Sequence, residues 1–469
     1  MDLHRLFHPR SVAVVGASLS LGEGKLPFFQ ILKAAGYPGP LYPVNPAHRE
    51  ILGEKVYPDL DSVPETVDLA ICTIPARAAL ETLERAVKKG IPFVHFFTSG
   101  FSERGDRGLE EALLRAARFG RTRIVGPNCL GIHCTASRVT FDPFILEDKP
   151  GPVAFLSQSG GVANNFTRMA RARRIGLNKA VSYGNQIDLR VEDYLEYFAC
   201  DDGIRAVAAY IEDIKDGRRF FEAARRLTRT RPFIVLKGGR TEAGALAAAS
   251  HTGALAGNRS VWSGLLRQAG CVEVETQEQL VDAVMIATAE RLPRGHRVGF
   301  LAAGGGTSVL FTDLAVLSGL AVPEIEPATQ ETVARKIPAV NTSVRNPVDL
   351  GAFGFDHRVM AHGMEALDRD RNIDVIVIYL CLDFLLMFRS EEIDAGLQAI
   401  AASAGRTEKP VVVVVARNAD DNPRLGEIRR AALTAFRGRG LPFYDTLQDA
   451  VSALSRILRW TLRPDEVEI

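Results

Sequence analysis

The amino-acid sequence predicts an α/β protein built from three consecutive doubly wound parallel-sheet domains. Short, continuously apolar and β-branched runs alternate with amphipathic helical segments, which is typical of parallel strands buried on both faces. Two stretches rich in proline, glycine and charge, residues 145–152 and 291–297, interrupt this alternation, which then resumes. We therefore expect domains at residues 1–148, 149–292 and 293–469.

The first domain is expected to contain five buried strands with their exit turns. Amphipathic helical patterns at residues 76–90 and 108–120 lie between them. The strand and turn segments are SVAVVGAS (11–18), GPLYPVNP (39–46), VDLAICTIPA (67–76), PFVHFFTSGF (92–101) and RIVGPNCLG (123–131).

The second and third domains repeat this pattern. The second series of strands comprises VAFLSQSGG (153–161), KAVSYGN (179–185), AVAAYIEDI (206–214), PFIVLKGGR (232–240) and CVEVET (271–276). The third comprises RVGFLAAGGGTS (297–308), IDVIVIYL (373–380), PVVVVVARN (410–418) and LPFYDT (441–446).

Composition bounds the possible partners. The 469 residues include 57 Lys and Arg against 56 Asp and Glu, a net charge of +1, so nothing electrostatic favours nucleic acid or an anionic membrane. An anion site must then be built from backbone amides and one or two placed cations. The six cysteines are scattered, without CxxC or a His/Cys pair at zinc spacing, so no metal site is expected. With no apolar signal segment at the N-terminus, these features predict a reduced, cytoplasmic protein.

A candidate nucleotide site lies at the ends of the first two strands. The first strand ends at Gly16, where a doubly wound fold binds phosphates on the following helix. The spacing in GASLSLGEGK (16–25) is neither G-x-G-x-x-G nor a Walker A loop. The second strand ends with Asn45, where a dinucleotide site usually places an acid. Asn45 and nearby Lys25 do not repel a phosphorylated ribose, so coenzyme A fits better than NAD; the alternative is a proline-braced strand end without a ligand.

The segment AAASHTGALAG (247–257) sets one imidazole, His251, among alanines, glycines and two hydroxyls. Nothing in this run packs a core, and only His251 offers acid–base or nucleophilic chemistry at neutral pH. The alternative interpretation is a small-residue helix start or crossover turn that happens to contain a histidine.

Eight motifs, in this order, give the chain a resemblance to a known family. They are SVAVVGAS, GPLYPVNP, SGFSERG, IVGPNCLG, FLSQSGG, YIEDIKDGRRF, VLKGGRTEAGALAAASHTGALAG and SVRNPVDLG. The chain resembles the NDP-forming acyl-CoA synthetases, most closely the α subunit of ADP-forming acetyl-CoA synthetase, in the succinyl-CoA synthetase superfamily. The resemblance implies a Rossmann-like CoA-binding domain and two flavodoxin-like domains, the first of which carries a phosphohistidine. It also implies a hetero-oligomer in which a partner, an ATP-grasp β subunit, binds ADP or ATP with Mg²⁺.

The resemblance further implies an acid–thiol ligase reaction. Acyl-CoA, ADP and phosphate would be interconverted with a carboxylic acid, ATP and CoA through an acyl phosphate and a phosphohistidine. His251 would be the nucleophile, and Glu212 would hold its second nitrogen. For Glu212 the alternative is an ordinary solvated carboxylate after a strand. Gly253 and Gly257 would let the segment around His251 move between sites.

Two further groups of residues are expected around the ligands. Phosphate would meet backbone amides at two helix starts, formed by Ser159, Gly160 and Gly161 and by Gly304, Gly305 and Gly306. For the second set a tight glycine turn is the alternative. The CoA-binding residues implied along the strand ends of the first domain are Gly16, Ala17, Ser18, Lys25, Val44, Asn45, Pro46, Ile74, Pro75, Ser99, Gly100, Asn128 and Gly131.

Several loops depart from the pattern of the acetate enzyme. SYGNQIDL (182–189) replaces S-x-G-N-x-A-D, Gly161 stands where alanine is common, Asp213 stands where glycine is common, and the third-domain turn continues GGGTS rather than GGPG. The acid therefore stays open among acetate and a branched, aromatic or dicarboxylic acid. Two other functions also remain: a non-catalytic CoA-binding or regulatory protein of the same fold, and a nicotinamide-dependent oxidoreductase, which Asn45 disfavours.

Overall fold

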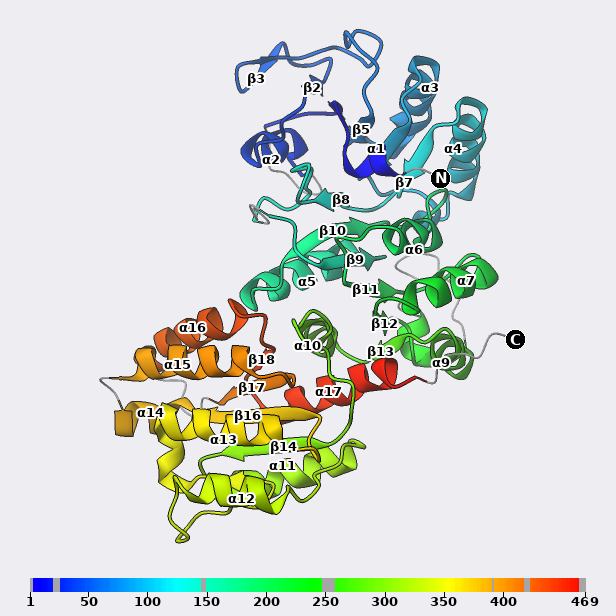
Figure 1. Cartoon of the computed structure of the whole chain (residues 1–469). Coiled ribbons are helices and arrows are strands. Elements are labelled where there is room, and N and C mark those ends of the chain that lie inside the picture. The colour runs from blue at the N-terminus through cyan, green and yellow to red at the C-terminus, as the bar shows by residue number, and fades with distance from the viewer. Residues whose placement is uncertain are drawn as a thin grey trace. The chain divides into compact units, whose positions relative to one another are not determined.

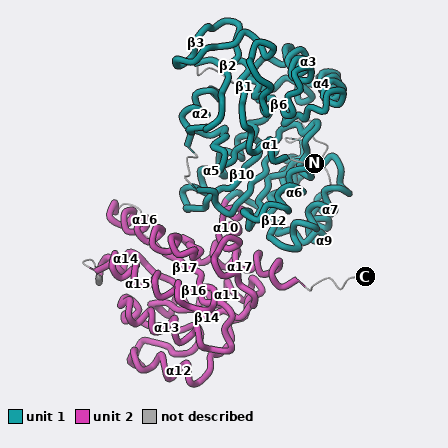
Figure 2. Tube along the Cα trace, turned by 45° about the horizontal axis from the view of Figure 1, so that its top comes forward, with its two compact units in different colours: residues 1–277 teal, residues 278–469 magenta. Residues whose placement is uncertain are grey.

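The computed structural model describes residues 3–19, 26–144, 149–246, 258–389, 392–416 and 422–463. They form three mostly parallel sheets with intervening helices (Figure 1). The chain divides into two compact units, residues 1–277 and 278–469; the first holds two sheets and the second holds the third (Figure 2). The predicted α/β class with three successive parallel sheets is confirmed, while the three domain boundaries stay a prediction.

The first sheet is entirely parallel. Its strands, in spatial order, are β2 (Leu41–Val44), β1 (Val12–Val15), β5 (Leu69–Cys72), β6 (Phe93–Phe96) and β7 (Arg123–Val125). Every residue of β1, β5 and β6 is buried, which is why these strands appear as unbroken apolar runs in the sequence. The unit's hairpin is β3 (Glu50–Ile51) with β4 (Glu54–Lys55), and its helical elements up to residue 120 are α1 (His4–Phe7), α2 (Phe28–Ala34), η1 (Ala76–Ala78), α3 (Ala79–Lys89), η2 (Ser102–Arg104) and α4 (Arg107–Gly120).

The second sheet has five parallel strands and one antiparallel edge. In spatial order these are β13 (Val272–Val274), β12 (Phe233–Lys237), β11 (Ala206–Ile211), β9 (Val153–Ser157), β10 (Leu177–Ser182) and the antiparallel β8 (Gly131–Cys134). Strand β8 comes from the segment expected to close the first domain, so the chain between residues 131 and 134 serves the second sheet. The helices that follow in sequence are α5 (Gly160–Ala172), α6 (Val191–Ala199), α7 (Gly217–Thr228) and α9 (Arg259–Gln268).

The third sheet forms the core of the second unit. Its strands, in spatial order, are β15 (Val348–Asp349), β14 (Val298–Ala302), β16 (Val375–Cys381), β17 (Val411–Ala416) and β18 (Phe443–Tyr444), all parallel. The helical elements of this unit are α10 (Gln277–Ala287), α11 (Gly305–Leu317), α12 (Pro327–Ala334), η3 (Gly351–Phe355), α13 (His357–Arg369), α14 (Leu382–Arg389), α15 (Ile393–Arg406), α16 (Pro423–Arg437) and α17 (Leu447–Thr461).

All three sheets share one strand order. If the parallel strands of each sheet are numbered along the chain, their spatial order is 2-1-3-4-5 in every case. In such a sheet the connections from strands 1 and 3 leave in opposite directions, and ligands bind outside the carboxyl ends of these two strands, at the switch point. The switch points lie between β1 and β5, between β9 and β11, and between β14 and β16.

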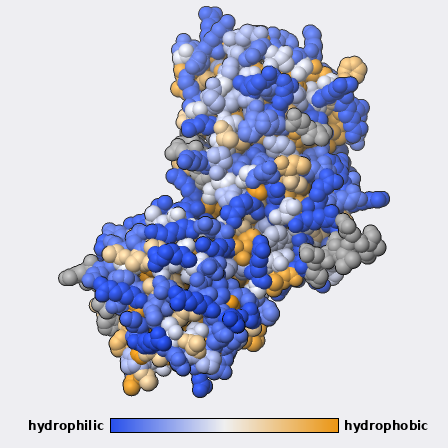
Figure 3. All heavy atoms as spheres, viewed as in Figure 1, coloured by the Kyte–Doolittle hydropathy of each residue, from blue (hydrophilic) through white to orange (hydrophobic). Residues whose placement is uncertain are grey.

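The visible surface is mostly hydrophilic, with apolar residues in small groups (Figure 3). In the part of the chain that the structure describes, no helix has both the length and the hydropathy to cross a membrane. The same residues contain no group of three His, Cys, Asp or Glu arranged to hold a metal ion. All six cysteines are free thiols.

Candidate functional site

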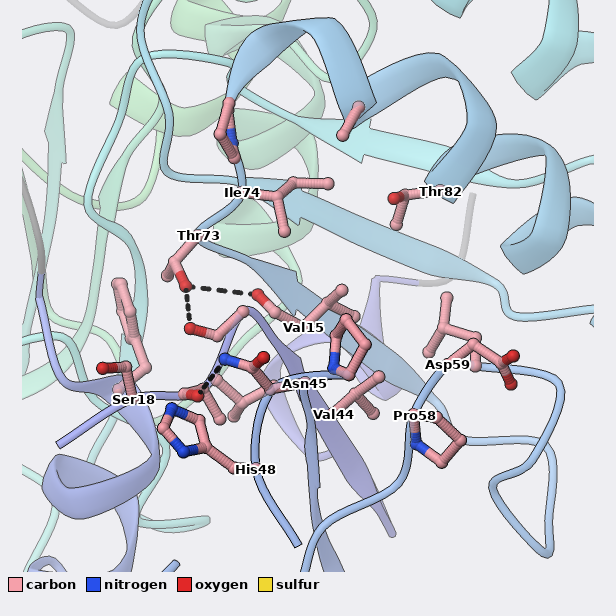
Figure 4. A pocket seen from close by; sticks show the side chains of 18 of the residues that line it. Val15, Ser18, Val44, Asn45, His48, Pro58, Asp59, Thr73, Ile74 and Thr82 are labelled. Atoms are coloured by element: carbon pink, nitrogen blue, oxygen red, sulfur yellow. Dashed lines mark hydrogen bonds between the residues drawn. The ribbon is translucent and has the colours of Figure 1, made fainter.

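A pocket of about 720 Å³ opens at the switch point of the first sheet (Figure 4). Its wall is formed by the ends of β1 and β2 and the residues that follow β1, β2 and β5, by the start of α2, by residues 58–60 and by α3 as far as Arg85. Eight of the thirteen residues predicted for CoA line it: Gly16, Ala17, Ser18, Val44, Asn45, Pro46, Ile74 and Pro75. Lys25 lies outside the described residues.

Gly16 makes the tight turn at the end of β1. Its φ is +86°, and a Cβ added there would lie 2.8 Å from Thr73 Oγ1. Thr73 Oγ1 donates to the carbonyls of Val15, at 3.2 Å, and Gly16, at 3.1 Å, across the switch point (Figure 4). The two loops therefore approach more closely than any side chain at position 16 permits.

Asn45 follows β2 directly and faces the same pocket (Figure 4). Its Nδ2 donates to the carbonyl of Ala17 at 2.8 Å, and its Oδ1 accepts from the N–H of Ala47 at 2.9 Å. An amide nitrogen carries two hydrogens and an amide oxygen two lone pairs, so each atom retains capacity for a ligand. Asn45 thus directly follows the second strand, where the sequence predicted it, and it also lines the pocket, while its contact with CoA stays a prediction.

The charge of the pocket wall is mixed. Among the lining residues that the structure describes, Arg85 is the one Lys or Arg, and it forms ion pairs with Glu81 at 2.9 Å and Asp59 at 3.3 Å. The hydrogen bond to Glu81 raises the pKa of Arg85. Arg85 also lies 3.3 Å from Asp61, outside the pocket wall, so the charge of this one cation is already shared with three carboxylates. This agrees with the expectation that an anion would rely on backbone amides.

The remaining predicted CoA residues, Ser99, Gly100, Asn128 and Gly131, lie outside this pocket wall. Asn128 follows β7, and its N–H donates to the carbonyl of Thr98 at 2.9 Å, which joins the loops after β6 and β7. Gly131 opens β8 with φ +87°, and a Cβ there would overlap the ring of His95. Close packing against His95 therefore accounts for a glycine at position 131 without any contact to a ligand.

Glu212 lies at the switch point of the second sheet, directly after β11. It is 6% exposed, so the alternative interpretation of an ordinary solvated carboxylate does not fit. Tyr210 Oη donates to Glu212 Oε1 at 3.1 Å, and burial, followed by the nearby Glu212 charge, raises the pKa of Tyr210. The carboxylate is thus held within the protein at the edge where this fold class binds ligands.

The two glycine-rich turns both start helices, as predicted. Helix α5 begins at Gly160, and the Oγ of its N-cap residue Ser159 accepts from the N–H of Val162 at 3.4 Å. Helix α11 begins at Gly305. The N–H of the preceding Gly304 donates to Asp349 Oδ1 at 2.8 Å, so a carboxylate already faces this second helix start. The two helix starts belong to different compact units.

His251 and the whole of residues 247–257 lie outside the described residues. The chain on either side is anchored in the second sheet domain, since β12 ends at Lys237 and α9 begins at Arg259 behind its N-cap Asn258. The role of His251 therefore stays a prediction.

Sequence analysis missed several residues around Glu212. Gln158, Lys237 and Gln186 all place buried polar groups at the same strand ends. Gln158 lies within the quoted motif FLSQSGG, but nothing local in a glutamine between a strand and a glycine turn reveals which distant strand it contacts.

Comparison with known proteins first defines the class. Residues 10–135 match a family model described as a CoA-binding domain, and residues 150–287 match the flavodoxin-like domain of succinyl-CoA ligases. Together with the three sheets, these matches define a CoA-binding α/β protein of the succinyl-CoA ligase type.

Full-length relatives narrow this class to a family. The chain is 34% identical over 470 residues to subunit alpha of ADP-forming acetate–CoA ligase I from Pyrococcus furiosus, covering 98% of each chain. It is 32% identical over 468 residues to ADP-forming acetate–CoA ligase I from Archaeoglobus fulgidus, covering 98% of this chain and 64% of that longer one. The solved dinucleotide-forming acetyl-coenzyme A synthetase 1 of Ca. Korarchaeum cryptofilum, in complex with phosphate and ADP, matches with a TM-score of 0.87 and 30% identity, over 98% of this chain and 97% of that one. The chain belongs to the family of ADP-forming acyl-CoA ligases, and the resemblance seen in its sequence is confirmed.

Proposed function

We propose that this chain is the α subunit of an NDP-forming acyl-CoA synthetase, an acid–thiol ligase that interconverts acyl-CoA, ADP and phosphate with a carboxylic acid, ATP and CoA. The observation that carries the proposal is that a buried carboxylate and the start of a helix follow neighbouring strands of one sheet. Glu212 and Ser159 follow the neighbouring strands β11 and β9, at the switch point of the sheet that matches the succinyl-CoA ligase model.

CoA is assigned to the first sheet. At Gly16 and Asn45 the pocket offers bare backbone and a neutral amide, and it falls within the segment that matches the CoA-binding model. Its volume, about 720 Å³, lies in the ordinary range for small-molecule sites. Ser99, Gly100 and Asn128, on the neighbouring loops, are assigned to the remainder of the ligand.

The chemistry is assigned in three steps. Phosphate attacks the acyl carbonyl of acyl-CoA, which gives an acyl phosphate and releases the CoA thiolate to be protonated. One nitrogen of neutral His251 then attacks phosphorus, and the carboxylate leaves. Glu212 accepts the hydrogen bond from the other ring nitrogen, which fixes the tautomer and stabilises the cation that develops. Finally an oxygen of ADP takes the phosphoryl group from His251.

The start of α5 is assigned to the phosphoryl group. Backbone N–H groups in the first turn of a helix, here at Gly160 and Gly161, provide partial positive charge without a cationic side chain. Phosphate binding at the start of α11, predicted for Gly304, Gly305 and Gly306, is a separate proposal, and Asp349 already accepts from the N–H of Gly304 there.

The partner is expected from the relatives. Some of them are named as alpha subunits, which implies a second subunit. We assign ADP or ATP and Mg²⁺ to an ATP-grasp β subunit and the assembly to a hetero-oligomer in the cytoplasm. The six free cysteines fit this reducing compartment.

Transfer of phosphate to the chain tests the proposal. The chain is incubated with its ATP-grasp partner, Mg²⁺ and ATP labelled at the γ-phosphate, and the label that stays on the protein is counted. Replacement His251→Asn is expected to remove the label and leave CoA binding unchanged, whereas the control His296→Asn keeps both. A label that persists in His251→Asn would overturn the assignment. CoA binding without a label on the unaltered chain would instead support the alternative, a non-catalytic CoA-binding or regulatory protein.

A further inference from the structure

Gln158 occupies the turn between β9 and α5, one residue before the N-cap Ser159. It is 3% exposed, although its side chain carries two polar groups. Burial of an amide costs free energy unless its hydrogen bonds are satisfied, so the partners of Gln158 indicate its structural role.

The hydrogen-bond partners of Gln158 lie at the end of β11 and in the two residues that follow it. Its Oε1 accepts from the backbone N–H of Glu212 at 2.8 Å and from that of Asp213 at 3.0 Å. Its own backbone N–H donates to the carbonyl of Tyr210 at 3.1 Å, and its Nε2 donates to Asp213 Oδ1. One residue therefore makes four hydrogen bonds to residues 210–213.

The orientation of this amide is fixed by what faces it. Two backbone N–H groups face Oε1, and the carboxylate of Asp213 faces Nε2, so a flipped amide would bring like groups together. Asp213 is itself held by Gln186 Nε2, at 2.9 Å from Oδ1, and by Lys215, at 2.7 Å from Oδ2. Asp213 is one of the positions that depart from the pattern of the acetate enzyme, and Gln186, which is bonded to it, directly precedes another, Ile187.

These contacts begin where the ladder of the sheet stops. The last pairing between β11 and β9 is Tyr210 with Ser157, and the last between β11 and β12 is Ile211 with Lys237. The pairing of β11 with both neighbouring strands therefore ends just before Glu212. On the β9 side Gln158 accepts from its N–H, and on the β12 side Lys237 Nζ donates to its carbonyl at 2.7 Å. Buried side chains thus complete the hydrogen bonding that the strands no longer provide.

We propose that Gln158 is a positioning residue, which holds the Glu212 carboxylate at a fixed place relative to the start of α5, as the role proposed for Glu212 requires. This inference rests on the proposed function. Gln158 touches neither ligand nor reacting atoms in this scheme. It acts because a single residue, adjacent to Ser159 in sequence and bonded to Glu212 in space, connects the carboxylate that orients the nucleophile with the helix start that binds the phosphoryl group.

A double-mutant cycle separates positioning from general stability. Gln158→Met removes both polar groups of the side chain at nearly constant volume, so Glu212 is expected to shift by about 1 Å. A shift of this size is expected to slow phosphorylation of the chain by labelled ATP, Mg²⁺ and the partner roughly 10- to 100-fold. In a Glu212→Gln chain, already slow, the same change is expected to cost less than about threefold, because residues that act through one another are not additive. Equal losses in both backgrounds, or no loss in either, would overturn the proposal.

A second pair of substitutions, at Gln158 and Asp213, distinguishes a loss of positioning from misfolding. Gln158→Glu keeps the acceptor for the two N–H groups but sets a carboxylate against Asp213, so labelling is expected to fall. Adding Asp213→Asn restores a donor and is expected to recover labelling to within about fivefold of the unaltered chain. Failure of that rescue, with CoA binding and melting temperature normal, would contradict positioning.

A matched control is Asn178→Ala, another buried amide at the opposite edge of the same sheet, where its Nδ2 donates to the carbonyl of Gly203 at 3.2 Å. It is expected to lower the melting temperature without slowing the label; slowing equal to that of Gln158→Met would overturn the proposal. Failure of the proposed function looks different. Absence of label on the unaltered chain, or full labelling of Glu212→Gln, removes the role of His251 or Glu212 itself, and the positioning role falls with it.

Discussion

Thr73 Oγ1 donates a hydrogen bond to the carbonyl of Gly16 at 3.1 Å, and a Cβ added to Gly16 would lie 2.8 Å from Thr73 Oγ1. The contact joins the ends of β1 and β5 at the switch point of the first sheet (Figure 4). The pocket proposed for CoA therefore depends on a turn that tolerates no side chain.

Replacement Gly16→Ala is expected to weaken CoA binding at least tenfold, measured by calorimetry. The methyl group must displace Thr73, and the residue must also adopt a positive φ at a cost of about 1 kcal/mol. Gly53→Ala is the matched control, because Gly53 has a similar φ of +78° but nothing within 4 Å of the added Cβ. If both variants bind CoA like the unaltered chain, the pocket is not the CoA site.

Replacement Asn45→Asp tests the choice of nucleotide. The new carboxylate loses the donor to Ala17 and adds a negative charge at the end of β2, so it should repel a phosphate on the ribose. We expect binding of CoA to weaken by tenfold or more. Binding of 3′-dephospho-CoA is expected to weaken several-fold less. Equal losses for the two ligands in a side-by-side titration would show that the 3′-phosphate lies elsewhere.

The fold was predictable because its determinants are local. Strands such as β1 and β5 are buried on both faces, so each is an unbroken apolar run, and helices such as α3 and α4 carry a clear amphipathic period. Strand β8 was not predicted. Its residues, Gly131–Cys134, pair with β10 more than 40 residues further on, and no local pattern announces a pairing over that distance.

The start of α5 offers a test in which stability and function change in opposite directions. Gly161 has open space around it, with only Ser159 Oγ at 3.9 Å from an added Cβ. Gly161→Asp is expected to keep or raise the free energy of unfolding by a few tenths of a kcal/mol, since a carboxylate suits the first helical turn. It should nevertheless slow labelling by ATP at least tenfold, because the new carboxylate occupies the place of the phosphoryl group. Gly161→Ala is the control, and equal labelling of the Asp and Ala variants would contradict a phosphate site there.

Stability should fall in mild acid because two histidines are buried in neutral form. Burial lowers the pKa of His95 to about 4 and that of His133 to about 4. In the unfolded chain the same two histidines bind protons near pH 6.5. Their contribution to the free energy of unfolding is therefore fully present above pH 6.5 and is lost as the pH falls from 6.5 towards 4. Between pH 7.5 and 5 each histidine should cost on the order of 2 kcal/mol.

Urea unfolding of the unaltered chain and of His133→Asn at pH 7.5 and 5 measures this loss. Among the described residues, the His133 ring forms hydrogen bonds with the hydroxyls of Thr140 and Thr135, so the variant removes one titrating group and disturbs few other contacts. The difference in unfolding free energy between the two pH values should shrink by on the order of 2 kcal/mol in the variant. An unchanged difference would show that His133 is not the source.

The candidate site was predictable in part. Asn45 and Ser159 were recognised because they follow predicted parallel strands, whose carboxyl ends meet at one edge where exposed loops bind ligands. Glu212 was recognised from the family resemblance, since a carboxylate after a strand has no local feature that marks it as buried. Gln158 and Lys237 were missed because their contacts depend on the strand order, which places β9 and β12 on either side of β11. No single segment of the sequence contains enough information to predict this order. His251 remains a prediction of the sequence alone.

The central claim is that the phosphoryl group is carried by His251, and peptide mapping tests it most directly. The chain is phosphorylated by ATP, Mg²⁺ and its ATP-grasp partner, digested with trypsin at alkaline pH, which preserves phosphohistidine, and analysed by mass spectrometry. The account predicts phosphate on the peptide of residues 241–259, which contains one histidine, and its loss when ADP is added back. Phosphate on any other peptide, or none that ADP can remove, would contradict it.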